Sequence, residues 1–145
     1  NVIAGANNEY NGDNGFFVQG HFNELISNKA SENDKIKRGH GNGIEVIGDN
    51  NKIRLNWLSK LNTNGYVVVG NNNFLEGNLT TKHKLWGITV TGDNAVLINN
   101  KATEGTDGIL VQGDNGDPSA SGGNTSNRGD CIIYGVTGQG VCTDF

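Results

Sequence analysis

A strand-like phrase bounded by two glycines recurs five times along the chain. Inside each phrase apolar residues alternate with other residues at a period of two, which indicates a β-strand with one buried face. The closing glycines are spaced by 28, 22, 22 and 21 residues, and the phrases span residues 15–20, 43–48, 65–70, 87–92 and 108–113. Repetition at a period near 22 residues predicts a solenoid, in which each coil packs against its neighbours.

Two further positions repeat in register with the closing glycines. An aliphatic residue and then an asparagine follow most of these glycines at fixed distances; the aliphatic residues are Leu25, Ile53, Leu75 and Leu97, and the asparagines are Asn28, Asn56, Asn78 and Asn100. Each coil is therefore predicted to hold three short strands and three turns. Because stacked coils lie about 4.8 Å apart, we expect the four asparagines to form a ladder whose amides bridge adjacent coils.

The phrases Gly43–Gly48 and Gly87–Gly92, each followed by a ladder asparagine, resemble the repeat of the right-handed parallel β-helix proteins of the pectin-lyase-like superfamily. The resemblance covers residues 14–113 and implies an all-β, single-stranded parallel β-helix of about six coils of ~22 residues with an asparagine ladder. We expect one domain over residues 1–145, with a first partial coil over 1–13 and an irregular C-terminal segment over 114–145. The superfamily includes polysaccharide lyases, glycoside hydrolases, epimerases, phage tailspikes and non-catalytic surface proteins, so function depends on particular residues.

The glycine content favours strands over helices. The 23 glycines among 145 residues argue against a helical solenoid, because glycine inside a helix costs about 1 kcal/mol relative to alanine.

The charge and hydropathy of the chain narrow the range of partners. With a net charge of −4 and no basic stripe, we expect no nucleic-acid partner. No apolar run approaches the ~20 residues that a membrane-spanning helix needs. The chain begins at Asn1 and shows no signal peptide, which is typical of a processed product or an excised fragment.

The two cysteines, Cys131 and Cys142, both lie near the end of the chain. A disulfide between them would close a loop of about ten residues and stabilise the fold by roughly 3 kcal/mol. The alternative is a pair of buried free thiols, whereas a metal site is disfavoured because two cysteines without a nearby histidine lack four ligands. A disulfide would place the protein in an oxidising compartment, at the cell surface or outside the cell.

Two basic clusters are the candidates for catalysis. The first comprises Lys35, Arg38 and His40, in an insertion over residues 31–41 that lengthens one spacing between glycines; the second comprises Lys82, His83 and Lys84. Polysaccharide lyases use Lys or Arg to abstract the proton beside a uronate carboxylate, and cations to neutralise that carboxylate. The phrase Gly39-His40-Gly41 also matches one short element of the polygalacturonases, but their Asn-Thr-Asp, Asp-Asp and Arg-Ile-Lys elements are missing. Because those catalytic elements are missing, we favour a non-catalytic protein and keep lyase or hydrolase chemistry as an alternative.

The phrase Gly-Asp-Asn recurs after three of the closing glycines and brings Asp49, Asp93 and Asp114 to equivalent turns. A row of carboxylate and amide oxygens could bind calcium. Asp and Asn also form Asx turns and tolerate left-handed backbone conformations. We favour this structural interpretation and expect no other cofactor.

The outward positions of the repeated strand are unusually apolar. If alternate residues of each phrase point inward, one surface collects the remaining side chains, here termed the contact face: Phe17, Glu45, Ile47, Val67, Val69, Thr89, Thr91 and Leu110. A single-layer sheet face is normally polar on the side that meets water, and a contiguous apolar patch indicates an interaction surface. We therefore expect this face to contact polysaccharide or another copy of the chain.

These patterns together predict a secreted or cell-surface β-helix module that binds carbohydrate or has a structural role. The alternatives are a self-assembling subunit of an extracellular fibre or oligomer, and a polysaccharide lyase or glycoside hydrolase. Two glycosylation sequons begin at Asn78 and Asn124. We expect Asn78 to be buried in the ladder and Asn124 to lie in a loop that a glycosylating host could modify.

Overall fold

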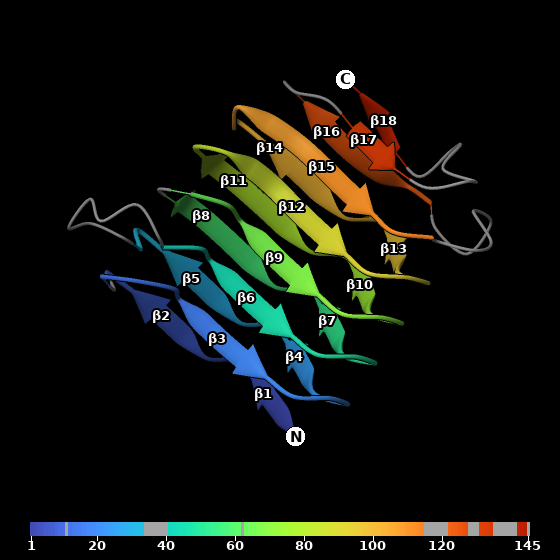
Figure 1. Cartoon of the computed structure of the whole chain (residues 1–145). Coiled ribbons are helices and arrows are strands. Elements are labelled where there is room, and N and C mark those ends of the chain that lie inside the picture. The colour runs from blue at the N-terminus through green and yellow to red at the C-terminus, as the bar shows by residue number, and fades with distance from the viewer. Residues whose placement is uncertain are drawn as a thin grey trace.

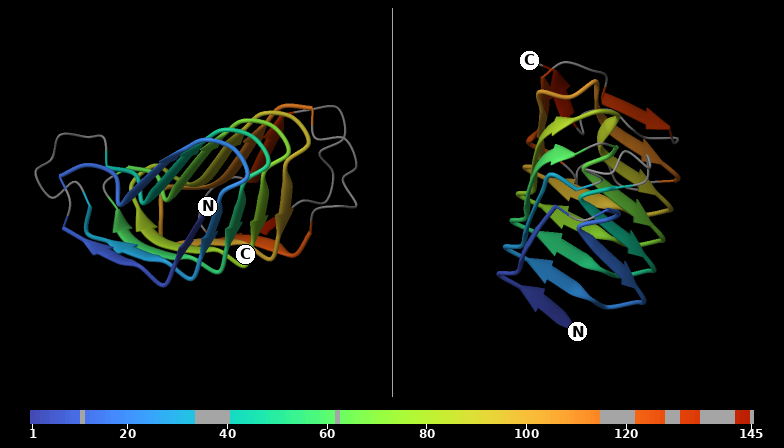
Figure 2. Two further views of the ribbon diagram at one scale, coloured as in Figure 1. Left: turned by 90° about the horizontal axis from the view of Figure 1, so that it is seen from below. Right: turned by 90° about the vertical axis from the view of Figure 1, so that its left-hand side faces the viewer.

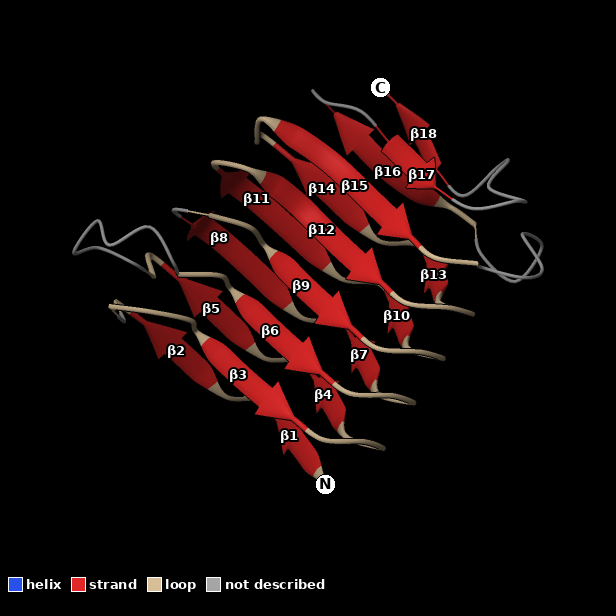
Figure 3. Ribbon diagram, in the orientation of Figure 1, coloured by secondary structure: helices blue, strands red, loops and turns tan. Residues whose placement is uncertain are grey.

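The chain winds into a parallel β-solenoid with three sides (Figure 1). The structure is a computed structural model that describes residues 1–10, 12–33, 41–61, 63–114, 122–127, 131–134 and 142–144. Figure 3 shows strands joined by turns, and the described residues form no helix. Accordingly, the described part of the chain contains no helix that could span a membrane.

Each side of the solenoid is one parallel sheet, here termed sheet A, B or C. Sheet A consists of β1 (Val2–Ala4), β4 (Glu24–Ile26), β7 (Lys52–Arg54), β10 (Phe74–Glu76) and β13 (Val96–Ile98). Sheet B consists of β2 (Asn7–Glu9), β5 (Lys29–Ser31), β8 (Trp57–Leu61), β11 (Leu79–His83), β14 (Lys101–Thr103), β16 (Asn124–Asn127) and β18 (Cys142–Asp144). Sheet C consists of β3 (Phe16–Gln19), β6 (Ile44–Ile47), β9 (Tyr66–Val69), β12 (Trp86–Thr91), β15 (Asp107–Gln112) and β17 (Cys131–Tyr134).

The chain visits the three sheets in the order A, B, C and then begins the next coil. Sheet C crosses the front of Figure 1 from left to right, and the chain returns behind it while it climbs from the N-terminal to the C-terminal end, so the coil is right-handed. The five strands of sheet A define five complete coils. In the sixth, a bridge between Ile98 and Gly122 replaces the strand of sheet A. The predicted fold class is confirmed, with about five turns in place of about six.

Figure 2 shows the solenoid from below and from one side. Buried side chains fill its interior. The residues predicted to point inward from sheet C are buried and stack in register: Ile44, Tyr66, Ile88 and Ile109 in one column, and Val46, Val68, Val90 and Val111 in the next. Tyr66 is the polar exception, and its hydroxyl donates a hydrogen bond to the carbonyl oxygen of Asn56 at 2.8 Å. Burial raises the pKa of Tyr66 well above its ordinary value. Tyr66 therefore stays neutral in a core where a phenolate would be costly.

The closing glycine of each phrase is a backbone requirement. Gly70, for example, adopts φ +132°, and a Cβ atom built there would overlap the carbonyl oxygen of Gly48 in the preceding coil. Glycine adopts such angles without steric cost. This close approach of successive coils explains why the closing glycine recurs with the period of the solenoid.

Candidate functional site

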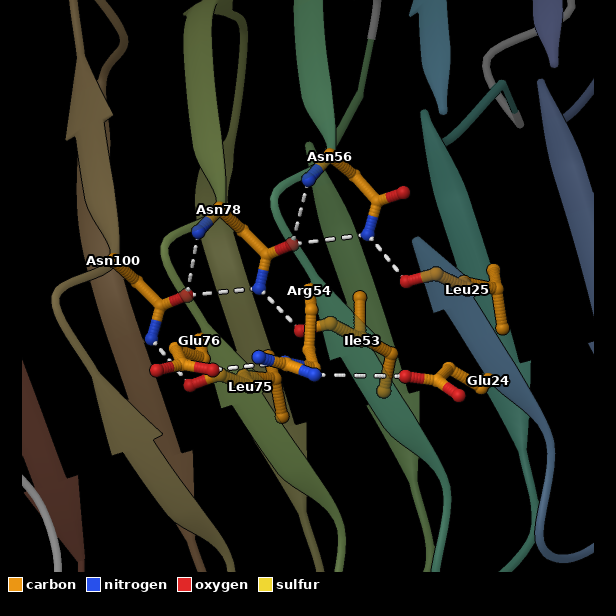
Figure 4. Close-up of polar contacts among 9 residues, drawn as sticks. All are labelled: Glu24, Leu25, Ile53, Arg54, Asn56, Leu75, Glu76, Asn78 and Asn100. Atoms are coloured by element: carbon orange, nitrogen blue, oxygen red, sulfur yellow. Dashed lines mark hydrogen bonds and ion pairs between the residues drawn. The ribbon is translucent and has the colours of Figure 1, made fainter. Parts of the chain in front are cut away.

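The predicted asparagine ladder lies at the corner where sheet A turns into sheet B (Figure 4). The backbone N–H of Asn56 donates to Oδ1 of Asn78 at 3.1 Å, and the N–H of Asn78 donates to Oδ1 of Asn100 at 3.0 Å. The side-chain nitrogen of Asn78 donates to Oδ1 of Asn100 at 2.9 Å and to the carbonyl oxygen of Ile53 at 2.7 Å. Each amide thus bridges the coils on both sides of it and satisfies buried backbone groups, as predicted.

The ladder extends further than the sequence analysis proposed. Asn28 begins the run described above, and Asn124 continues it beyond Asn100, because the N–H of Asn100 donates to Oδ1 of Asn124 at 2.9 Å. Asn124 is buried and starts β16, so its predicted position in an accessible loop is wrong. Asn78 is buried as predicted. Neither sequon therefore presents its asparagine to a glycosylating enzyme in the folded chain.

Two shorter ladders occupy the other two corners. Between sheets C and A, the N–H of Asn23 donates to Oδ1 of Asn51 at 2.9 Å, and that of Asn51 donates to Oδ1 of Asn73 at 2.9 Å. Between sheets B and C, a ladder of the opposite polarity runs from Asn14 through Asn42 to Asn64. All three corners are therefore held by amide-to-backbone hydrogen bonds between coils.

The aspartates considered for calcium lie outside the corner between sheets C and A. Oδ1 of Asp49 accepts the backbone N–H of Asn71 at 2.7 Å, and Oδ1 of Asp93 accepts that of Asp114 at 2.9 Å. These contacts support the structural role that the sequence analysis favoured. Among the described residues, no three His, Cys, Asp or Glu side chains are grouped to hold a metal ion.

The two basic clusters are placed very differently. Lys35, Arg38 and His40 lie outside the described residues. Lys82 and Lys84 are exposed, whereas His83 is buried. Lys82 adopts a left-handed conformation with φ +57°, which interrupts the strand alternation and turns the next side chain inward. His83 therefore points away from its two lysine neighbours and does not share a surface with them.

The environment of His83 is structural in character. Its Nε2 lies 2.8 Å from the carbonyl oxygen of Asp107, and its Nδ1 lies 3.5 Å from Oγ1 of Thr80. The ring fills the space above Gly105, where a Cβ atom would overlap it. Burial lowers the pKa of His83, and the hydrogen bond to Asp107 opposes this effect only in part. The neutral imidazole with a proton on Nε2 satisfies this site.

The contact face predicted for sheet C is present and partly exposed. Phe17 and Val69 are 55% and 39% exposed, and Glu45, Ile47, Val67, Thr89 and Leu110 are half-buried, with Thr91 exposed. The registers of β3, β6 and β9 place Phe17, Glu45 and Val67 in one row across the sheet. In this row, the acidic side chain of Glu45 therefore lies between two apolar side chains.

Sheet B carries a second exposed surface, here termed the Trp57 groove. Its cavity is about 220 Å³ and is lined by Asn7, Glu9, Lys29, Ser31, Trp57 and Ser59. The indole of Trp57 is 47% exposed, and Nζ of Lys29 lies 5.4 Å from its centroid. The groove thus combines an aromatic platform with hydroxyl, amide and charged groups that can hydrogen-bond a ligand.

Ion pairs close the edge of sheet B beyond this groove. Lys60 donates to Oε1 of Glu32 at 3.0 Å, and this hydrogen bond raises the pKa of Lys60. Nζ of Lys82 lies 3.7 Å from Oε2 of Glu104. Because these pairs are exposed, each adds little to stability. Lys60 and Lys82 thus pair with glutamates, whereas Lys29 faces the indole of Trp57.

The outer face of sheet A carries a three-membered ion cluster (Figure 4). Nε of Arg54 donates to Oε2 of Glu76 at 2.8 Å, and Nη1 of Arg54 lies 3.7 Å from Oε1 of Glu24. The three residues lie on adjacent coils and neutralise one another to leave a single negative charge. We assign them to the cohesion of sheet A.

A second cavity lies at the corner between sheets B and C, here termed the B–C pocket. It measures about 400 Å³ and is lined by the three ladder asparagines of this corner together with Asp13, Glu45, Thr63 and Leu85. Oε2 of Glu45 accepts hydrogen bonds from Nδ2 of Asn14 at 2.7 Å and from Nδ2 of Asn42 at 3.2 Å. Glu45 thus belongs both to the contact face and to this pocket.

Sequence reasoning missed the Trp57 groove, although a signal for it was present. Lys29, Trp57 and Lys101 each directly follow a ladder asparagine, and the registers of sheet B align them in one outward row. The side chains of Cys131 and Cys142 lie outside those that the structure describes, so their disulfide stays a prediction.

The fold and these surfaces define a parallel β-solenoid protein with an asparagine ladder. Comparisons with protein-family models, with curated proteins and with solved structures find no match to this chain.

Proposed function

We propose that this protein is a non-catalytic, polysaccharide-binding β-solenoid module, secreted or displayed at a cell surface, with the pectin-lyase-like architecture that its repeat resembles. The observation that carries the proposal is the half-exposed indole of Trp57 within a groove of hydrogen-bonding side chains. An exposed indole offers a flat apolar surface to the C–H face of a pyranose ring. Seryl and asparaginyl groups around it suit the sugar hydroxyls.

The size of the groove favours a polymer over a small enclosed ligand. Pockets for small molecules typically measure about 300–1,000 Å³, whereas the Trp57 groove measures about 220 Å³. A groove of this size holds about one sugar ring at a time. An extended polysaccharide gains further contacts along the sheet, where Leu79 and Lys101 continue the outward row from Trp57.

The proposal is tested by replacing the aromatic platform. We expect Trp57→Ala to lower the affinity for a polysaccharide by about tenfold or more. Tryptophan side chains that a ligand covers on binding often contribute most of the binding energy. Phe22→Ala is the matched control, because it removes an exposed aromatic side chain that lies outside both the Trp57 groove and the contact face. Affinity electrophoresis in gels containing soluble neutral and acidic polysaccharides supplies the measurement. Equal migration of wild type and Trp57→Ala in every retarding gel would refute the proposal.

The contact face supports a second, weaker interaction. The five strands of sheet C that carry the contact face, β3, β6, β9, β12 and β15, are four to six residues long. They cover roughly 400 Å² in projection, given about 4.8 Å between strands and about 3.3 Å per residue. A stable protein–protein interface buries about 800 Å² on each partner. We therefore infer that this face alone supports transient contact with another copy or with a polymer, and does not hold a permanent dimer.

A further inference from the structure

The B–C pocket contains a carboxylate that is held in place before any ligand arrives. Both amide donors, from Asn14 and Asn42, reach Oε2 of Glu45. The amide of Asn42 is itself fixed, because its Oδ1 accepts hydrogen bonds from Oγ1 of Thr63 at 3.0 Å and from Nδ2 of Asn64 at 3.1 Å. The side chain of Glu45 therefore has one oxygen anchored, while no described donor reaches its Oε1.

The charges of the pocket favour a cationic ligand. Asp13 adds a second carboxylate to the lining, and the described lining residues include no Lys, Arg or His. Opposite charges attract strongly in a partly enclosed site, where water screens them less than in bulk solution. Leu85, which is 50% exposed, adds an apolar wall.

The hydrogen bonds of the ladder decide which cation the pocket suits. Oδ1 of Asn14, of Asn42 and of Asn64 each already accepts a backbone N–H, from Asn42, Asn64 and Trp86 respectively. Calcium takes six to eight oxygen ligands, and the two carboxylates with one threonine hydroxyl supply at most five, so water would have to complete the set. A primary ammonium needs only three acceptors, which Glu45, Asp13 and Thr63 can provide.

We propose that the B–C pocket binds the protonated amino group of an amino sugar. The ammonium donates to Oε1 of Glu45 and to the carboxylate of Asp13. The sugar ring packs its C–H face on Leu85. This site is separate from the Trp57 groove, since the two share no lining residue, and it does not depend on the function proposed for that groove.

The test compares ligands that differ only in the amino group. Isothermal titration calorimetry near pH 6 keeps ordinary carboxylates ionised, and the ligands are glucosamine oligosaccharides and their N-acetylated counterparts. We expect binding of the free amine and at least about tenfold weaker binding of the acetylated form, since a charge-assisted hydrogen bond is lost. Equal binding of both forms would overturn the proposal. Putrescine and calcium chloride are titrated as two further ligands. If either one binds more tightly than the glucosamine oligosaccharides, and Glu45→Gln weakens that binding, the proposal is likewise overturned.

Variants then connect the binding to the pocket. Glu45→Gln keeps the side-chain shape and should weaken glucosamine-oligosaccharide binding by about tenfold or more. Asp13→Asn, at an exposed position where folding is not at risk, should weaken it by a smaller factor. Glu104→Gln removes one negative charge from the edge of sheet B and should leave it unchanged. Trp57→Ala should also leave it unchanged, so failure of the groove and failure of this pocket remain distinguishable. Unaltered affinity in both Glu45→Gln and Asp13→Asn would refute the assignment.

Discussion

Nζ of Lys29 lies 5.4 Å from the centroid of the Trp57 indole, on the adjacent coil of sheet B. The ammonium group therefore covers part of the aromatic surface that a sugar ring would use. An exposed cation–π contact contributes about 0.5–1 kcal/mol. Any ligand that stacks on this side of the indole has to displace Lys29 or pair with it.

This arrangement predicts opposite effects for neutral and acidic polysaccharides. Lys29→Met uncovers the indole, so we expect affinity for a neutral polysaccharide to rise by about two- to fivefold, which corresponds to the lost cation–π contact. Affinity for an acidic polysaccharide should fall, because the cation beside the platform is removed. Affinity electrophoresis checks both effects. Lys52→Met, which removes an exposed cation from sheet A, is the control.

The amide of Asn78 is expected to be essential to the stability of the solenoid. Asn78→Ala removes the partners of the Asn56 N–H and of the Ile53 carbonyl group, both within the buried corner. Leaving two buried polar groups unpaired should lower the free energy of unfolding by about 2–5 kcal/mol. Asn7→Ala, at an exposed position, is the control in urea unfolding followed by circular dichroism. Equal midpoints for the two variants would contradict the role of the ladder.

Phe22 is a candidate for stabilisation by substitution. It adopts φ +56° and is 73% exposed, while the equivalent turns carry Asn50, Asn72 and Asn94 at similar angles. Left-handed conformations cost most residues about 1–2 kcal/mol, and asparagine tolerates them better. Phe22→Asn should therefore raise the free energy of unfolding by about 1 kcal/mol. Phe17→Asn, within the extended strand β3, should give no such gain, and thermal unfolding distinguishes the two.

The buried imidazole of His83 should make stability depend on pH. Because its pKa is lowered in the folded state, the unfolded chain binds the proton more readily. Stability is then fully present above the ordinary histidine pKa of about 6.5 and declines as pH falls below it, towards the folded-state value. We expect His83→Gln, which keeps an N–H donor for the Asp107 carbonyl, to reduce this slope. Urea unfolding at about pH 8 and about pH 5 measures it, and identical slopes in both proteins would contradict the assignment.

The contact face predicts weak self-association. Sedimentation velocity over a dilution series should show mainly monomer, with any concentration-dependent increase in mass suppressed by combining Phe17→Gln with Val69→Gln. A dimer that persists on dilution and survives this double substitution would show that a surface other than sheet C is responsible. If the wild-type dimer persists on dilution but the double variant is monomeric, the contact face binds more strongly than its area suggests.

The architecture and one ladder followed from the sequence because both repeat with the period of the coil. Gly70 and Asn78 are fixed by contacts between equivalent positions, so spacing alone identifies them. The inward columns of sheet C followed from simple alternation for the same reason. The ladder at the B–C corner left a similar trace, since Asn14, Asn42 and Asn64 all directly precede a glycine.

The candidate sites depend on departures from that period. His83 points inward because Lys82 takes a left-handed conformation, which no alternation rule reveals. The contact of Glu45 with Asn14 joins residues 31 positions apart across two coils of unequal length. The Trp57 groove needs the register of sheet B before Glu9, Lys29 and Trp57 can be placed together. Periodicity therefore predicts the scaffold, while the surfaces proposed to bind ligands need the detailed registers and turns of the structure.

The three corner ladders also bear on how such a chain can change its length. Equivalent residues of the central coils are spaced by 22 positions in every one of the ladders. Insertion or removal of one whole 22-residue unit from this region would leave each remaining amide facing an equivalent partner. The solenoid can thus lengthen or shorten by tandem duplication or loss of a coil without a new core, and a repeat-duplicated variant should fold with one additional rung.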